Sequence, residues 1–233
     1  MFFLSKIEVG SHFYINFSEN LHLHGETVIV SSLVVTALIL FLILGTQNLE
    51  KVPGTLQNIT EILYEFVKSI AFTQMGPSYY SQFLPFVATI FLFVLGSNLS
   101  GALIPWKLLE LEAGEFAAPT NDINTTACLA ILTSLAYFFA GFKIKGIGYF
   151  KRYIKPAPFF LPINIVEDFT KPLSLNFRLF GNVVADELTV TVICSLVPLI
   201  IPLPIMMLGL FASSLQALIF ATLAAAYIGE VIE

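Results

Sequence analysis

The stretch Asn176-Phe177-Arg178-Leu179-Phe180-Gly181-Asn182 decides how this chain is interpreted. It lies inside Leu173–Ile205, a segment long and apolar enough to enter a bilayer, and Asp186 and Glu187 follow soon after Arg178. A guanidinium stays charged at every physiological pH, and placing it at membrane depth costs roughly 2.5 to 17 kcal/mol, depending on the scale. A chain that carries this cost beside two carboxylates is predicted to move ions or protons, or to bind a charged group, within the membrane.

The composition is that of a membrane protein. Of 233 residues, 57% are hydrophobic and 12% are charged, and the mean hydropathy is +0.85. A soluble domain has about 25% charged residues, so we predict an all-α polytopic protein that forms one membrane domain over residues 1–233. The net charge of −5 leaves no basic surface for nucleic acid. Cys128 and Cys194 fall in apolar stretches and are expected to be buried free thiols.

Five stretches are candidates for membrane-embedded helices, which need about 20 mostly apolar residues. They are Val28–Gly45, Phe83–Pro105 (interrupted by Gly96-Ser97-Asn98 and Gly101), Ala127–Ile144, Leu173–Ile205 and Met206–Ile228. Proline in a helix interior breaks or kinks the helix. The cluster of Pro198, Pro202 and Pro204 therefore predicts a helical hairpin turn between the last two.

The stretch Leu56–Ile70 differs from these spans because its apolar residues recur at helical spacing. The apolar positions are Ile59, Ile62, Leu63, Phe66, Val67 and Ile70, and Glu61, Glu65 and Lys68 occupy the other side. This pattern predicts an amphipathic helix that lies at the membrane interface. An ordinary packed helix in an extramembrane loop is the alternative.

Lysine and arginine residues crowd one loop, and their placement indicates orientation. The loop after the third span contains Lys143, Lys145, Lys151, Arg152 and Lys155. Acidic residues dominate the loop after the second span and the segment before the first. We therefore expect residues 1–27 to form an external N-terminal segment and the C-terminus to lie inside. No internal repeat is visible, which disfavours an inverted-repeat transporter.

The fourth span presents polar residues on two faces when residues 166–194 are placed on one helix. Glu167, Lys171, Arg178 and Asn182 fall within an arc of about 60°, with Ser174 about 40° from Arg178. Glu167 and Lys171 are four residues apart and are expected to pair. Asn182 is placed to orient the Arg178 guanidinium or to hold a water. Glu187 lies on nearly the opposite face, so it is not expected to pair with Arg178 within the helix.

The last span has one strongly polar side chain, Gln216, which in a hairpin is placed to face the helix that carries Glu187. Its neighbours Ser213, Ser214 and Thr222 are interpreted as structural, because hydroxyls in membrane helices often bond adjacent helices. Two alternatives stay open for the fourth span. Lys171 could reach the interface from a helix end, and Asp186 could mark a helix end near the headgroups.

Motifs for other chemistry are missing from the sequence. His12, His22 and His24 all precede the first span and are interpreted as surface residues. There is no HExxH, no GxSxG and no phosphate-binding loop. We expect no metal, no cofactor and no catalytic residue in this chain.

Several motifs along the chain belong together. They are Asn176–Asn182 with Ala185-Asp186-Glu187, Leu215–Phe220, Pro119–Thr126, and Phe83–Phe86 with Gly96–Leu99. In combination they resemble subunit a of F-type ATP synthases, over nearly the whole chain from Ile7 onward. Glu8-Val9-Gly10 and His24-Gly25 resemble the plastid and cyanobacterial branch.

This resemblance implies a stator protein packed against a rotor ring of subunit c. The peripheral stalk subunits b, the catalytic head of the ATP synthase and the lipid membrane would be its other partners. The last two helices would form a long, strongly tilted hairpin over residues 173–230. Two aqueous half-channels would meet the ring on either side of the family's essential arginine, here Arg178.

The resemblance also implies roles for individual residues. Glu187, Asn182 and Gln216 match positions that line proton access, Ser174 matches one on the other half-channel, and Asp186 and Lys171 fit the photosynthetic branch. One position departs from the pattern. Many bacterial members have a histidine seven residues before the glutamine, where this chain has Gly209. Asp186 is the candidate to supply the missing polar group.

The implied function is a non-catalytic proton channel whose flow drives rotary ATP synthesis by other subunits. The implied location is a plastid or cyanobacterial thylakoid membrane, with a lumenal N-terminus and a stromal C-terminus. The alternative is a standalone ion-coupled secondary transporter, which would need a substrate site within this chain. A purely structural scaffold would leave Arg178 and Glu187 unexplained.

Overall fold

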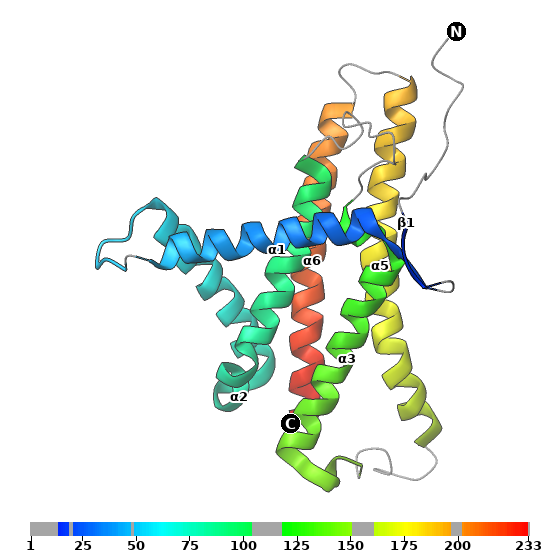
Figure 1. The fold of residues 1–233 in the computed structure, drawn as a ribbon. Coiled ribbons are helices and arrows are strands. Elements are labelled where there is room, and N and C mark those ends of the chain that lie inside the picture. The colour runs from blue at the N-terminus through cyan, green and yellow to red at the C-terminus, as the bar shows by residue number, and fades with distance from the viewer. Residues whose placement is uncertain are drawn as a thin grey trace.

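The computed structural model describes residues 14–18, 21–47, 49–103, 118–150, 161–196 and 202–232. Its elements are β1 (Tyr14–Ser18), β2 (Leu21–His24), α1 (Gly25–Thr46), α2 (Thr55–Leu103), the 3-10 turn η2 (Pro119–Asn121), α3 (Ile123–Lys145), the 3-10 turn η3 (Gly146–Phe150), α5 (Leu161–Leu196) and α6 (Pro202–Ile232). The all-α polytopic class is confirmed for the membrane part (Figure 1). Sequence analysis missed the short antiparallel pair β1–β2, which precedes α1.

Four described helices are long and apolar enough to cross a membrane: Thr27–Thr46, Thr55–Gly101, Ile123–Lys145 and Leu203–Ile232. The expected fourth span, Leu173–Ile205, is wrong in its bounds, because α5 runs from Leu161 to Leu196. Its charged residues, Glu167, Asp168, Lys171, Arg178, Asp186 and Glu187, also distinguish it from the other long helices. The expected hairpin turn falls on residues outside the described part of the chain, except for Pro202 and Pro204. These two prolines lie in the first turn of α6, where a helix tolerates proline.

Helix α2 consists of two limbs that meet at Gly76. This residue has φ 72° and ψ 171°, a backbone conformation that glycine adopts at no steric cost, and Pro77 follows it. The expected amphipathic segment Leu56–Ile70 lies in the first limb and the second expected span in the other. Gly96, Ser97 and Asn98 do not interrupt the helix, contrary to the sequence expectation.

The first limb of α2 turns only part of its apolar side toward the protein. Val67 is buried and Ile70 packs against the core, whereas Ile59, Ile62 and Phe66 are exposed. The limb is therefore packed on one side and leaves an apolar side for lipid. Its location at the membrane interface stays a prediction.

Helices α5 and α6 are longer than the hydrocarbon core of a bilayer is thick. With 36 and 31 residues, they extend roughly 54 and 46 Å at about 1.5 Å per residue, against a hydrocarbon core of about 30 Å. Figure 1 shows α1 running across the long axes of both helices. If α1, with 22 residues, spans the membrane, α5 and α6 must lie strongly tilted within it. This agrees with the expected long, tilted hairpin.

The core lies where α6 meets the second limb of α2 and α3. Small residues of α6 are completely buried there: Ala217, Ala221, Ala224 and Ala225. Gly229 brings α6 closest to α2, because a Cβ added to it would collide with the carbonyl oxygen of Gln74. Small residues let membrane helices approach closely and gain van der Waals contact. This packing sets the register of α6, and thus the position of Gln216.

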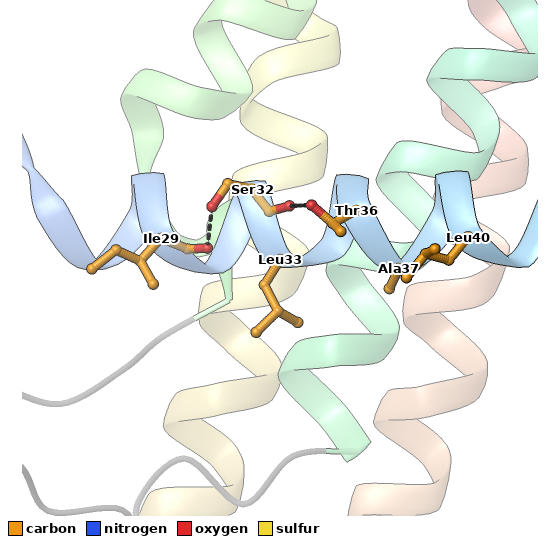
Figure 2. A pocket seen from close by; sticks show the side chains of 6 residues that line it. All are labelled: Ile29, Ser32, Leu33, Thr36, Ala37 and Leu40. Atoms are coloured by element: carbon orange, nitrogen blue, oxygen red, sulfur yellow. Dashed lines mark hydrogen bonds between the residues drawn. The ribbon is translucent and has the colours of Figure 1, made fainter.

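Helix α1 contributes little to that core, and most of its large side chains are exposed. Figure 2 shows its shallow outer groove, lined by Ile29, Ser32, Leu33, Thr36, Ala37 and Leu40. The hydroxyls of Ser32 and Thr36 each donate a 2.7 Å hydrogen bond to a carbonyl oxygen within the helix. The groove is therefore effectively apolar. Cys128 on α3 is a free thiol, as expected, but it is exposed rather than buried; the Cys194 side chain lies outside the described residues.

Candidate functional site

The polar residues of α5 separate into two groups on either side of Arg178. We call Asn121, Asp186, Glu187 and Ser213 the carboxylate cluster, and Glu167, Lys171, Tyr227 and Glu230 the lysine cluster. Lys171 and Glu187 are 16 residues apart, which is roughly 24 Å along a helix. Sequence reasoning had grouped Lys171 with Arg178 on one helical stripe. In the structure, Lys171 instead contacts the end of α6.

Glu187 lies beside the turn that precedes α3. The side-chain amide of Asn121 in η2 donates a hydrogen bond to Glu187 Oε2. Asp122, the next residue, caps α3 by accepting a 2.9 Å hydrogen bond from the Asn124 backbone N–H. The Pro119–Thr126 motif thus connects the start of α3 to the last third of α5. Sequence analysis used this motif only for the resemblance and did not assign Asn121 to the site.

Asp186 occupies the space beside Gly209. A Cβ added to Gly209 would stand 3.6 Å from Asp186 Cγ, and Ser213 Oγ donates a 3.4 Å hydrogen bond to Asp186 Oδ2. The absence of a side chain at Gly209 leaves room for the carboxylate. Asp186 therefore lies directly beside position 209. That it compensates for the missing histidine stays a prediction. Ser213, interpreted as structural from the sequence, contacts this carboxylate directly.

Polar side chains bond α6 to α5 and to α2 near Gln216. The Oε1 of Gln216 accepts a 3.0 Å hydrogen bond from Asn182 Nδ2, so the expectation that Gln216 faces the helix of Glu187 is confirmed. The Gln216 side chain is only 2% exposed, and its Nε2 is buried without a protein partner. One turn away, Asn98 Nδ2 of α2 donates a 2.9 Å hydrogen bond to the Ser213 carbonyl oxygen, and the Oδ1 of Asn98 is also buried without a partner.

These buried polar atoms have a physical consequence. An unpaired polar atom in a protein interior is costly and is usually satisfied by an ordered water. Gln216 Nε2 offers a donor, and Asn98 Oδ1 and Ser97 Oγ offer acceptors. Each of these atoms is therefore a candidate to bind an ordered water. Sequence analysis missed Ser97 and Asn98, which it interpreted as an interruption of the span.

Arg178 is exposed on the outer side of α5. Its Nη2 donates a 3.5 Å hydrogen bond to Ser174 Oγ, one turn earlier. Asn182, which was expected to orient the guanidinium, bonds Gln216 instead. Leu175 and Leu179, which lie about 60° and 100° around the helix from Arg178, are buried. The arginine is therefore accessible at the surface of the described helices, with Ser174 as a hydrogen-bond partner.

The lysine cluster anchors the start of α5 to the end of α6. Lys171 Nζ lies 3.1 Å from Glu167 Oε1 and 2.7 Å from Glu230 Oε2, and 5.4 Å from the Tyr227 ring centroid. The predicted Glu167–Lys171 pair is confirmed. Lys171 is 8% exposed, which contradicts the alternative that it extends freely to the interface. Glu230 was not anticipated, because its partner is 59 residues away in the sequence.

Within the described part of the chain, no group of three or more His, Cys, Asp or Glu residues could hold a metal ion. The arrangement is that of a helical membrane protein whose acidic, basic and amide groups line the contacts between long helices. Such groups inside a membrane mark a path for ions or protons.

Comparison with known protein families identifies the family to which this chain belongs. A model of the ATP synthase A chain family matches residues 28–229, which is most of the chain. The protein belongs to this family, whose members are non-catalytic, proton-translocating subunits of the ATP synthase membrane sector. It is accordingly an integral membrane protein of proton transport and ATP synthesis, and it works within the ATP synthase complex with its c ring.

Proposed function

We propose that this chain is the stator that carries protons to and from the rotor ring through two half-channels. The observation that carries the proposal is the division of the polar groups of α5 into two clusters, with Arg178 between them. With α5 tilted along the membrane, the two clusters would be displaced sideways relative to each other. A sideways offset suits a path that is completed by rotation, whereas a direct pore would place its polar groups along the membrane normal.

The exposed side of α5 supports a docking face for the rotor. Phe177 is 57% exposed beside Arg178, and Gly181 has nothing within 4 Å of where a Cβ would stand. On α6, Leu215 and Ile219 are each 41% exposed. This face is apolar, open and centred on one permanent positive charge. It fits a ring of apolar hairpins, each of which carries one carboxylate.

The carboxylate cluster is proposed to deliver protons to the ring. Glu187 takes and gives the proton, and Asp186 adds a second carboxylate where Gly209 leaves space. Asn182 and Gln216 connect this cluster to the Arg178 side of the helix through their 3.0 Å hydrogen bond. Waters held at the buried amides can carry a proton between side chains that do not touch.

The lysine cluster and Ser174 are proposed to line the other half-channel. Glu167 and Glu230 have side chains that are 48% and 44% exposed, so they reach water while Lys171 is covered. A proton that leaves the ring near Ser174 meets exposed carboxylates at this end of the hairpin. Lys171 holds both carboxylates in place by charge-assisted hydrogen bonds.

Rotation follows from the cost of charge in lipid. A rotor carboxylate that has been neutralised by a proton can pass through lipid, whereas the ionised form is expensive there. Arg178 attracts the ionised form and keeps the two half-channels electrically separate. Each proton contributes about 2.3 kcal/mol per 100 mV, so several protons must be accumulated by rotation for one ATP.

We place the protein in a plastid or cyanobacterial thylakoid membrane, with its N-terminus in the lumen and its C-terminus in the stroma beside the catalytic head. The N-terminal motifs and the basic residues after α3 support this. The peripheral stalk subunits b would hold the chain at a surface away from Arg178, and the apolar groove of α1 (Figure 2) is such a surface.

The orientation is tested by single cysteines at Ser11 and Gly148, in a background that lacks Cys128 and Cys194. Gly148 is preferred to Gly146, since Gly146 has a φ of 54° that strains any other residue. An impermeant thiol reagent is expected to label the two cysteines from opposite sides of sealed vesicles. Labelling from the same side would contradict the proposed topology.

The stator function is tested by purification and proton flux. The tagged chain is expected to co-purify with the rotor ring and the catalytic head, and vesicles that contain the complex should acidify when ATP is added. The alternative, a standalone transporter, predicts substrate-coupled flux by the isolated chain. Flux that requires neither ring nor head would overturn the proposal.

A further inference from the structure

Asn121 contacts Glu187 across 66 positions of sequence. It belongs to η2, the 3-10 turn of Pro119–Asn121, whereas Glu187 lies in the last third of α5. The contact is a hydrogen bond from the Asn121 side-chain amide to the Glu187 carboxylate. An amide does not titrate, so the donor is available at every pH.

The backbone holds the Asn121 side chain in place from both directions. The Asn121 N–H donates a 2.9 Å hydrogen bond to the Ala118 carbonyl oxygen, and Pro119 and Thr120 are buried. On the other side, Asp122 caps α3 and accepts a 3.5 Å hydrogen bond from Thr27 Oγ1 of α1. The turn is therefore built by its backbone and by its neighbours. The Asn121 side chain is not needed to form it.

We propose that Asn121 is a positioning residue for Glu187. A glutamate side chain has several rotatable bonds, and a fixed donor at one carboxylate oxygen selects one orientation among them. The carboxylate is then held in a constant orientation for proton exchange. This inference rests on the relay function proposed for Glu187, and it explains why η2 approaches α5 at this residue.

Removal of the donor is expected to slow the relay without dismantling the turn. Asn121→Leu keeps a similar shape and lacks the amide, so ATP-driven proton pumping by the full complex in vesicles should fall roughly tenfold, the factor typical of one hydrogen bond to a charged group. Asn121→Gln retains an amide donor and should recover part of the rate. Asn124→Leu is the matched control, because Asn124 donates to Asp122 in the same segment; it should pump near the wild-type rate.

The pH dependence of proton pumping distinguishes a positioning role of Asn121 from a role in packing alone. A hydrogen bond to a carboxylate contributes to its proton affinity, so the pH of half-maximal pumping should move in Asn121→Leu and stay in Asn124→Leu. A packing defect would lower the rate equally at every pH and leave that midpoint unchanged. Asn121→Ala serves for the same comparison if the leucine variant does not assemble.

Two results would overturn the inference. One is an assembled Asn121→Leu complex that pumps at the wild-type rate. The other is a slowed complex with an unmoved pH midpoint and no recovery by Asn121→Gln. Glu187→Gln, measured in the same membranes, distinguishes the underlying function: if it slows pumping and Asn121→Leu does not, only the positioning role fails. If Glu187→Gln pumps normally, the relay itself is wrong and the inference fails with it.

Discussion

Arg178→Ala is expected to abolish ATP synthesis driven by an imposed pH gradient in an assembled complex. The guanidinium is the permanent charge on the exposed side of α5 between the two polar clusters. Without it, the ionised rotor carboxylate loses its attraction to the stator, and protons can pass from one half-channel to the other. Synthesis in reconstituted vesicles is the measurement, and a pH dye should report a passive leak where synthesis is absent.

Two further variants sharpen this test. Arg178→Lys should also fail to restore normal synthesis, because an ammonium loses its proton more readily when buried and lacks the planar fork of a guanidinium. Lys68→Ala is the control, since Lys68 is an exposed cation on the first limb of α2. Near-normal synthesis by an assembled Arg178→Ala complex would overturn the mechanism.

Glu187→Gln is expected to slow ATP-driven proton pumping by about 100-fold or more, the contribution typical of a positioned acid–base group. The amide keeps the shape of the side chain but cannot cycle a proton. Gln216→Leu should have a smaller effect, because it removes the partner of Asn182 and a site for water rather than a proton carrier. Initial rates of acidification in vesicles with equal amounts of complex provide the comparison.

An exposed carboxylate elsewhere is the control for this second test. Glu65→Gln on the first limb of α2 removes one negative charge far from the carboxylate cluster, and it should leave pumping unchanged. If Glu187→Gln and Glu65→Gln behave alike, Glu187 has a structural role and the access path must run through other groups.

Much of the fold could be predicted because a chain in lipid has few options. Every backbone polar group must be satisfied within the protein, so apolar stretches become helices. Proline also marked the start of the last helix, since α6 begins at Pro202. The Glu167–Lys171 pair was also predictable, since residues four apart on a helix are neighbours.

The two wrong predictions about helix bounds, for α5 and for the interruption of α2, have a common cause. The expected bounds of α5 came from hydropathy, which excludes the charged turns around Glu167 and Lys171, although those turns are helical and packed against α6. Ser97 and Asn98 were interpreted as a break for the same reason. Polar residues that form hydrogen bonds or ion pairs with a neighbouring helix do not end a membrane helix. A local stretch of sequence does not show which helix will be its neighbour.

The sequence by itself determined that this is a helical membrane protein with an arginine and two carboxylates on one long helix. Tertiary structure alone decided which polar groups meet: Asn121 with Glu187, Asn182 with Gln216, and Lys171 with Glu230. The reason is that each helix's rotation and register depend on close packing, as at Gly229 against Gln74. Such contacts join residues far apart in the chain, and no local pattern specifies them.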